Sequence, residues 1–416
     1  MKKILVIVES LDINDSSATK GRISLINNLF QCGFQLRVCH YTRKSVDLKS
    51  IKFENIECIS IPEKKWNFLY FLSRAERLFT RATKISLNPL LEGWFGFSFT
   101  FFNDSNSIAA AIQQQNDFQP DLVLTLSKGA SFRPHHAMLK VPELHDKWMA
   151  YIHDPYPFHF YPRPYNWVEH GYYKKQEFFR AVSKKAKFSA FPSQLLQEWM
   201  GSYFPDFLRT GVLIPHQISD YQIQDTTFPS FFNPEKFSLF HAGNLMKQRD
   251  PIFLIQAFEK FLDNNPEAKE QSQLILVGAH EYHKEALERY KNHSSVFIGE
   301  NMPFDVVFNL QKNASVNVIL ESKAEISPFL PGKFPHCVQA NKPILLLSPY
   351  YSETRRLLGE DYPYWSEVDN VSKMEAIIAI MFTNWKEKKG IFELNRPDLL
   401  DYLSVEQLKE TLTTLQ

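Results

Sequence analysis

The stretch FSLFHAGNLMKQRDPIFLIQAFEKFL, residues 237–262, contains the pattern that decides the fold. It begins with an apolar run typical of a buried strand, and Gly243 then permits a tight turn. A helix is expected to begin near Pro251, because proline is favoured in the first turn of a helix. Another apolar run, SQLILVGA at 272–279, follows as the next strand. Strand, helix and strand in this order predict a parallel βαβ unit.

The same alternation extends through both halves of the chain. It predicts an α/β protein with two doubly wound, Rossmann-like domains that face each other across a cleft. Each domain is expected to have a mostly parallel sheet covered on both faces. The other predicted strands are ILVIV (4–8), FQLRVCHY (34–41), IECISI (56–61), LVLTL (122–126), WMAYI (148–152), KFSAF (187–191), GVLIP (211–215), SSVFIG (294–299), SVNVIL (315–320) and KPILLLS (342–348).

A polar segment separates the two halves. Residues 217–235 are rich in Asp, Thr, Pro and Asn and interrupt the apolar periodicity, which predicts a linker. We therefore expect one domain over residues 1–216 and a second over residues 236–385. The remaining residues, 386–416, are expected to be helical and to cross back to the first domain.

The composition is that of a globular protein without a dominant charge. The 416 residues are 44% hydrophobic and 22% charged, and the formal net charge is +1. A nearly neutral chain gives no overall reason to expect nucleic acid as a partner. Any anion site must therefore be local.

The cysteines and the apolar runs favour a cytoplasmic protein. The four cysteines lack C-x-x-C spacing, which favours reduced thiols. The N-terminal apolar run stops at Glu9, far short of the apolar region of a signal peptide. Nor does any run approach the roughly 18 apolar residues of a spanning helix, so a membrane contact would be peripheral, at the inner face of the membrane.

Two turns in the second half carry residue types that bind anions. In open α/β sheets, ligands bind beyond the carboxyl ends of the strands, where both turns are expected. One turn runs from Gly243 to Arg249 and also contains Lys247. The other, which contains Lys333, follows the strand at 315–320, so both could hold one diphosphate. A glycine turn with solvated basic residues would give the same pattern.

These turns resemble the nucleotide-sugar domain of glycosyltransferases of the GT-B fold, particularly those of family 4. In that family a Gly-Arg pair follows the first strand of the domain, and a Lys comes six positions after the Gly. Here Arg249 lies six positions after Gly243, and Asn244 stands in the place of the Arg. The family's later motif, a proline turn with a lysine followed by A-x-G-K-P, is matched by Pro331 to Pro343, which includes Lys333.

Two glutamates of the family motif are replaced in this chain. The second, which holds the ribose of the donor, falls on His336. The first falls on Pro328, with Glu325 and Ser327 nearby but out of register. The resemblance implies that His336 binds the ribose, since imidazole can hydrogen-bond a hydroxyl, although a helix-surface imidazole would look the same. It also implies a donor-sugar loop with Glu325 and Ser327, and a diphosphate site made of Gly243, Asn244, Arg249, Gly332 and Lys333.

In the first half, His153 and Asp154 follow the predicted strand at 148–152. Many of these transferases have Arg-Asp-Pro-Trp at the matching place, and here the sequence is His-Asp-Pro-Tyr. The resemblance implies that Asp154 or His153 contacts the acceptor or takes its proton. An aspartate that caps the turn before Pro155 is the structural alternative.

Two further pairs of residues are expected on the acceptor side. His135 and His136 follow the predicted strand at 122–126, where the family has a histidine. Lys20 and Arg22 lie near the helix start after the first strand, in a loop that faces the cleft in GT-B enzymes. A capped, solvated helix N-terminus would explain this loop equally well.

The stretch KKWNFLYFLSRAERLFTRATK, residues 64–84, mixes basic and large apolar side chains at helical spacing. The pattern is typical of a helix that lies on an anionic membrane, and also of one that buries its apolar side in its own domain. We expect the second arrangement, with the basic side in solvent.

The resemblance implies a glycosyltransferase that moves a sugar from a nucleotide-diphosphate sugar to a hydroxyl of a glycan, a lipid-linked or another acceptor, in glycan or polysaccharide biosynthesis. Retention of the anomeric configuration is implied, with no bound metal and no cofactor beyond the nucleotide-sugar co-substrate. One alternative is a nucleotide-sugar 2-epimerase of the same fold. Another is a degenerate relative that binds a nucleotide or glycan without turnover, which the missing acidic pair favours.

Overall fold

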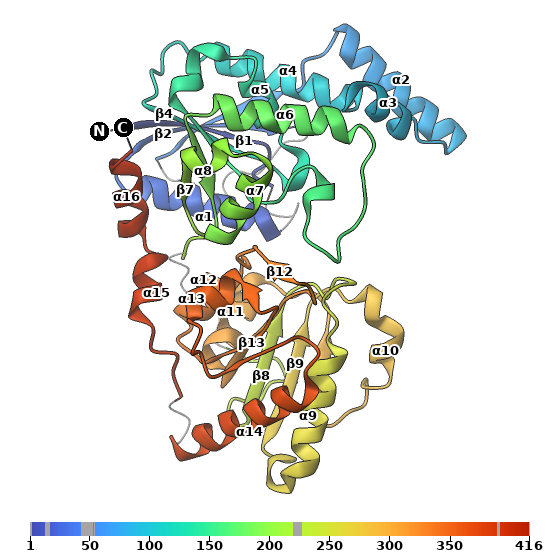
Figure 1. The fold of residues 1–416 in the computed structure, drawn as a ribbon, viewed down its shortest axis with the longest axis vertical. Coiled ribbons are helices and arrows are strands. Elements are labelled where there is room, and N and C mark those ends of the chain that lie inside the picture. Colours follow the sequence, from blue (N-terminus) through green and yellow to red (C-terminus); the bar gives the residue numbers. More distant parts are fainter. Residues whose placement is uncertain are drawn as a thin grey trace. The chain divides into compact units, whose positions relative to one another are not determined.

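The computed structural model describes residues 2–12, 17–42, 53, 55–218, 227–388 and 392–415. The chain divides into two compact units (Figure 1). Unit 1 takes in Met1–Tyr161, Tyr165–Gln217 and Val405–Gln416, and unit 2 takes in Pro162–Pro164 and Ile218–Ser404. Each unit is built on a parallel sheet, which confirms the predicted α/β class.

In the described part of unit 1, seven parallel strands form one sheet in the order β3-β2-β1-β4-β5-β6-β7. Ile4 of β1 pairs with Leu36 of β2 on one side and with Leu122 of β4 on the other. From β1 the chain adds β2 and β3 on one side of the sheet, and it then adds β4 to β7 on the other side. Open α/β sheets bind ligands at such a switch point, which here lies between β1 and β4. The strands are β1 (Lys3–Val8), β2 (Gln35–Thr42), β3 (Glu57–Pro62), β4 (Leu122–Leu126), β5 (Trp148–Tyr151), β6 (Phe188–Phe191) and β7 (Gly211–Leu213).

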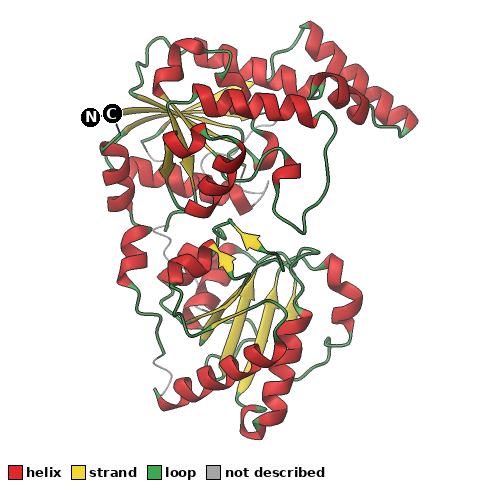
Figure 2. Ribbon diagram, in the orientation of Figure 1, coloured by secondary structure: helices red, strands yellow, loops and turns green. Residues whose placement is uncertain are grey.

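Helices cover both faces of this sheet (Figure 2). Alternate side chains of β1 enter different cores: Leu5 and Ile7 pack with Ile108 of α4, whereas Val6 packs with Ile26 of α1. Burial on both faces explains why β1 and β4 are continuous apolar runs. The helices of unit 1 are α1 (Ser17–Gln31), α2 (Phe68–Thr83), α3 (Asn88–Phe95), α4 (Phe99–Gln113), α5 (Arg133–Met138), α6 (Tyr172–Lys185), α7 (Gln194–Tyr203), α8 (Asp206–Thr210) and α16 (Val405–Thr413).

Unit 2 repeats the same topology. Six parallel strands of its described residues have the order β10-β9-β8-β11-β13-β15, and β12 and β14 form a separate parallel pair. β8 occupies the central place that β1 has in unit 1, with β11 across the switch point. The strands are β8 (Phe237–Ala242), β9 (Ser272–Val277), β10 (Val296–Gly299), β11 (Val316–Leu320), β12 (Ile326–Ser327), β13 (Ile344–Leu347), β14 (Tyr351–Ser352) and β15 (Trp365–Ser366).

The sheet of unit 2 is also covered on both faces. Phe237 and Leu239 of β8 pack with α9 and α14, whereas Phe240 packs with Leu310 of α11. The helices of unit 2 are α9 (Ile252–Asn264), α10 (Lys284–Glu288), α11 (Phe304–Asn313), α12 (Phe334–Gln339), α13 (Glu353–Leu358), α14 (Val371–Glu387) and α15 (Pro397–Tyr402). Among the described residues of the chain, no helix combines the length and the apolar character that crossing a membrane requires.

The C-terminal helices divide between the two units. Leu399 of α15 packs with Ile344 of β13 in unit 2, whereas Leu408 of α16 packs with Ile26 of α1 in unit 1. The sequence placed the start of the returning segment at residue 386, but the chain joins unit 1 only from Val405. Residues 219–226 of the predicted linker lie outside the described residues.

Candidate functional site

Two glycines bring the turns after β8 and β9 into contact. Gly243 has φ +147° and Gly278 has φ +145°, conformations that side chains disfavour. A Cβ atom on Gly278 would lie 2.2 Å from the Gly243 carbonyl oxygen, so only glycine allows this approach. The Gly243 N–H donates to the Val277 carbonyl at 2.9 Å, and the Leu245 N–H donates to the Ala279 carbonyl at 2.8 Å. The predicted turn at Gly243 therefore needs Gly278, which sequence reasoning did not single out.

Lys333 reaches this turn from the loop before α12. Its Nζ lies 2.9 Å from His241 Nδ1 and donates to the Val318 carbonyl at 3.2 Å. A Cβ atom on Gly243 would lie 3.8 Å from the same Nζ. The two turns that the sequence predicted to share an anion are thus brought together, with His241 between them.

His241, Arg249, Glu321 and Lys333, called the second-unit cluster below, influence one another electrostatically. Burial lowers the pKa of Lys333 to about 7, with a further lowering by Arg249. Burial is the largest cause that lowers the pKa of His241, and the positive charges of Lys333 and Arg249 lower it further. His241 is therefore neutral at pH 7, and Lys333, with a pKa of about 7, is about half protonated at this pH.

The guanidinium of Arg249 has a buried N–H donor that is available to a ligand. Its Nε is buried and has no hydrogen-bond partner within the described part of the chain. A buried guanidinium nitrogen without an acceptor is costly, and an anion with several oxygens would satisfy it.

Glu321 is a cluster residue that sequence reasoning missed. It follows β11 directly and is 3% exposed. One carboxylate oxygen accepts hydrogen bonds from Ser352 Oγ at 3.0 Å and from Thr354 Oγ1 at 2.7 Å. Burial raises the pKa of this carboxyl, and the hydroxyl bonds and Arg249 oppose the rise. An acidic residue immediately after the predicted strand at 315–320 was the signal that could have revealed it.

Of the other predicted donor residues, Ser327 contacts this cluster, and Asn244, Gly332 and Glu325 are exposed. Asn244 is exposed, and its Oδ1 accepts from the Ala279 N–H at 3.4 Å. Gly332 is exposed, and a Cβ atom there would contact nothing, so packing does not require a glycine. Glu325 is also exposed, whereas Ser327 is buried and hydrogen-bonds Glu321.

His336 lies on α12 against the aromatic side of α11. Its ring centroid is 5.0 Å from that of Phe304 and 5.7 Å from that of Phe308. The side chain is half-buried rather than fully exposed on the helix surface. The structure therefore gives it an aromatic setting, and ribose binding stays a prediction.

The carboxyl end of the first sheet carries the predicted His153 and Asp154. Both follow β5, and His153 Nε2 lies 3.4 Å from Asp154 Oδ2. Burial raises the pKa of Asp154 to about 7, and a hydrogen bond with Tyr161 opposes this. Burial and then Arg22 lower the pKa of His153 to about 4. Asp154, with 28% of its side chain exposed, can therefore exchange a proton near neutral pH.

Other charged groups at this edge are paired within the protein. Arg22 donates to the Ser127 carbonyl at 3.1 Å and to Thr19 Oγ1 at 2.6 Å. Glu9 accepts from Arg133 Nη1 at 2.7 Å and from the Lys128 N–H at 3.0 Å. Arg22 is thus buried in a structural role beside His153, while Lys20 is exposed.

The structure places both His135 and His136 among aromatic side chains. His135 is fully buried against Phe132, and burial lowers its pKa to about 3. His136 packs against Phe97 and Phe101, and burial likewise lowers its pKa to about 3. Both imidazoles are neutral at pH 7, and the fully buried His135 has no surface for an acceptor to contact. His136 is half-buried, and its acceptor role stays a prediction.

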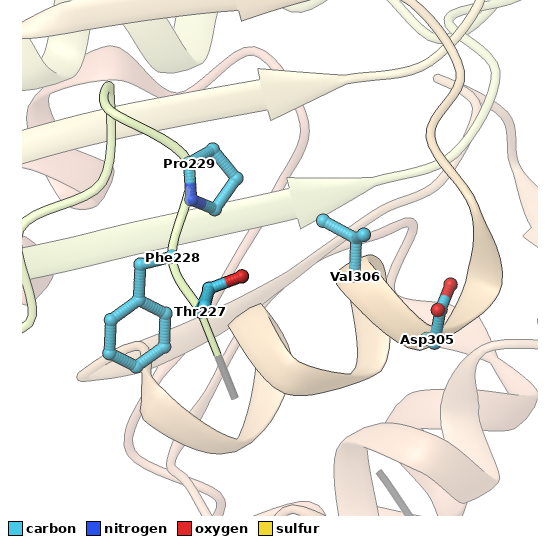
Figure 3. Close-up of a pocket in the computed structure, with 5 residues that line it drawn as sticks. All are labelled: Thr227, Phe228, Pro229, Asp305 and Val306. Carbon is cyan, nitrogen blue, oxygen red and sulfur yellow. The ribbon is translucent and has the colours of Figure 1, made fainter. Parts of the chain in front are cut away.

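A hollow of about 180 Å³ lies beside the start of α11 (Figure 3). It is lined by Thr227, Phe228, Pro229, Asp305 and Val306, none of which is a predicted site residue. Ligand pockets usually begin at roughly 300 Å³, so this hollow is small for a nucleotide sugar.

Solved structures that match this fold include glycosyltransferases of the GT-B fold. HepE from Anabaena, solved with UDP and glucose, matches with a TM-score of 0.59 at 14% identity over 100% of both chains. A glycosyltransferase from Rickettsia africae matches with a TM-score of 0.63 at 14% identity, over 100% of this chain and 99% of that one. TarM from S. aureus, solved with fondaparinux, alpha-GlcNAc-glycerol and UDP, matches with a TM-score of 0.61 at 11% identity over 99% of both chains.

These likenesses establish the GT-B fold for this chain. No protein-family model matches the sequence. No curated protein matches it either.

Proposed function

We propose that the chain is a glycosyltransferase, similar to family 4 enzymes, that uses a nucleotide-diphosphate sugar. The observation that carries the proposal is the contact of Lys333 Nζ with His241 Nδ1 at 2.9 Å, at the carboxyl end of the central strand of unit 2, with Arg249 near enough to lower the pKa of both groups. Two cations from separate turns, one with an unsatisfied buried donor, suit a diphosphate. The bound UDP in HepE and in TarM supports a nucleotide ligand for this fold.

The cations of the second-unit cluster would act on the leaving group. When the sugar is transferred, negative charge develops on the departing diphosphate, and preorganised positive groups stabilise that charge. Lys333 would be held in place by His241 and the Val318 carbonyl, and Glu321 would limit the net positive charge of the site before a donor binds. His336 would hold the ribose, and Ser327 and Glu325 would lie near the donor sugar.

Asp154 is the proposed group for the acceptor hydroxyl. Its raised pKa, near 7, suits a group that accepts a proton or a hydrogen bond at neutral pH. His153 is neutral at this pH and would orient or share the acceptor hydroxyl. We propose a glycan, lipid-linked or other hydroxyl acceptor, and retention of the anomeric configuration.

A donor screen followed by product analysis tests the function. Thermal shift with UDP-, GDP- and ADP-sugars selects the donor, because a ligand that binds the folded state raises the melting temperature. The protein is then incubated with that donor and hydroxyl acceptors, and the products are separated. A glycosylated acceptor with acceptor-dependent nucleotide release supports the proposal. An epimerised nucleotide-sugar would identify the 2-epimerase instead, and donor binding without turnover would identify a degenerate relative.

A further inference from the structure

Large apolar side chains are exposed on two helices of unit 1 and next to them. Of the large apolar side chains that are exposed in the described part of the chain, nine lie between residues 66 and 95. Figure 1 shows α2 and α3, which carry most of them, at the outer end of unit 1, beyond α4 and α6. We call these residues the α2–α3 face: Trp66, Phe68, Phe71, Leu78, Phe79, Ile85, Leu90, Trp94 and Phe95.

The α2 helix buries its polar side and exposes its apolar side. Its buried residues are Ser73 and Glu76, whereas Phe68 is 76% exposed and Leu78 is 63% exposed. The helical periodicity places the exposed apolar residues on one side and the buried polar pair on another. The expectation that this helix buries its apolar side is therefore wrong. Burial raises the pKa of Glu76, because burying this carboxyl disfavours its charged form. The apolar side of the helix is meanwhile exposed to water.

This orientation of α2 is fixed by specific contacts. Asn67 caps the helix by accepting from the Tyr70 N–H at 3.0 Å, and it donates to Asn103 of α4 at 2.9 Å. Arg74 forms an ion pair of 3.0 Å with Glu63. The apolar side therefore cannot turn inward without breaking the cap and the ion pair.

The α3 helix is anchored in the same way. Lys175 of α6 forms an ion pair of 2.8 Å with Glu92. A Cβ atom on Gly171 would lie 1.9 Å from the Glu92 carbonyl oxygen, so α3 and the start of α6 meet at backbone distance. Both helices of the α2–α3 face are thus held in place by contacts with the rest of unit 1.

The segment that carries this apolar face is rich in positive charge, although Glu63 pairs with two of its arginines, Arg74 and Arg77. Residues 64–96 contain six Lys and Arg and two Glu, although the whole chain has a net charge of only +1. Arg81 and Lys84 are exposed at the end of α2. Trp66 and Trp94 are 82% and 63% exposed, and indole rings favour the boundary between lipid and water.

We propose that the α2–α3 face docks on the surface of an anionic lipid bilayer. The apolar side chains would enter the boundary between headgroups and acyl chains, and the basic residues would contact the anionic headgroups. A second copy of the chain fits less well, because a symmetric contact would bring two basic segments together. This inference does not depend on the proposed transferase activity.

Vesicle flotation of the full-length protein tests the proposal. The probes are vesicles of phosphatidylcholine alone and of phosphatidylcholine mixed with phosphatidylglycerol. We expect binding to the mixed vesicles, weakened by salt, and little binding to the neutral ones. The double variant Arg81→Gln/Lys84→Gln should bind about tenfold or more weakly, because each cation near an anionic surface contributes about fivefold. Phe71→Ser/Leu78→Ser should also bind about tenfold or more weakly.

Matched controls come from unit 2. Tyr282 is 70% exposed and the Lys291 side chain is 71% exposed, so Tyr282→Ser and Lys291→Gln should leave vesicle binding unchanged. Phe71 and Leu78 of the face and the neighbouring Arg81 and Lys84 are all exposed, so the variants should fold, which circular dichroism checks. The absence of binding to anionic vesicles at low salt would overturn the proposal, as would equal loss in the controls. A dimer that Phe71→Ser/Leu78→Ser dissociates, without vesicle binding, would show that a second copy covers the face.

Discussion

The carboxyl edges of the two sheets have the same topology and opposite charge arrangements. In unit 1, Arg133 forms ion pairs with Glu9 at 2.7 Å and with Asp104 at 3.0 Å. In unit 2, no carboxylate of the described residues lies within ion-pair distance of Arg249 or Lys333. The difference shows that one edge pairs its cation directly with carboxylates, whereas the other holds Lys333 and Arg249 with only the longer-range influence of Glu321.

The two arrangements have different costs. Buried ion pairs need both partners, because removing one leaves a buried charge uncompensated. Cations that are held together without carboxylate partners reduce the stability of the folded protein until an anion binds. The comparison therefore predicts opposite responses when cations are removed from the two edges.

The largest effect is expected for Arg133→Met. Glu9 is 6% exposed and Asp104 is 1% exposed, so both carboxylates would stay buried without their cation. We expect a loss of about 3 to 5 kcal/mol in the free energy of unfolding, measured by chemical denaturation. Arg249→Met, the matched removal in unit 2, should leave the free energy of unfolding unchanged or raise it. Equal losses in the two variants would contradict the comparison.

A smaller effect is expected for Asp154→Asn in sugar transfer. The amide cannot accept the acceptor's proton, so the rate should fall about a hundredfold, while donor affinity stays unchanged. Because burial raises the pKa of Asp154 to about 7, the wild-type rate should fall as the pH drops through 7. The variant should lack this limb of the pH profile. A variant with the wild-type rate and profile would exclude Asp154 from the reaction.

The stability of Lys333→Met should reveal the cost of the buried ammonium. The pKa of Lys333 is about 7 in the folded protein and 10.5 as its ordinary value, so the unfolded state holds an extra proton between these values. Wild-type stability therefore gains with pH from about 7 to about 10.5, and the full cost is present below 7. The variant should melt several degrees higher than the wild type at about pH 6, with a smaller difference at about pH 9. A lower melting temperature at pH 6 would mean that the ammonium stabilises the fold.

The smallest effect concerns the pH dependence of donor binding. A bound diphosphate favours the charged form of Lys333, so binding above pH 7 requires uptake of a proton. Affinity should fall by up to about tenfold per pH unit above 7, which titration calorimetry in buffers of different ionisation enthalpy can detect. Lys333→Met should bind weakly at every pH without this slope, and a slope retained in the variant would assign it to another group.

Most of the fold could be predicted because buried parallel strands have a strong local signal. The predicted strand at 122–126 matches β4, and the predicted strand at 237–243 contains β8. β15, with two residues, has too little sequence for such a pattern. The orientation of α2 was wrong for a different reason: periodicity shows that two sides differ, and it does not show which side the protein covers.

The candidate site was predicted in part. Gly243 and Lys333 could be singled out because glycine and lysine next to strand ends have specific uses. Glu321 and Gly278 depend on contacts between segments that are distant in the sequence, such as the bonds from Ser352 and Thr354 to Glu321. His135 shows the reverse error, since a histidine near a strand end can belong to the core.

Calorimetric binding of the donor selected by the screen tests the central claim most directly. Arg249→Gln and Lys333→Met should each lose about 1 to 3 kcal/mol of binding free energy, the scale of a charged hydrogen bond. Lys247→Gln, which alters an exposed lysine of the same turn, should bind like the wild type. Wild-type affinity in both Arg249→Gln and Lys333→Met would contradict a diphosphate site at the second-unit cluster.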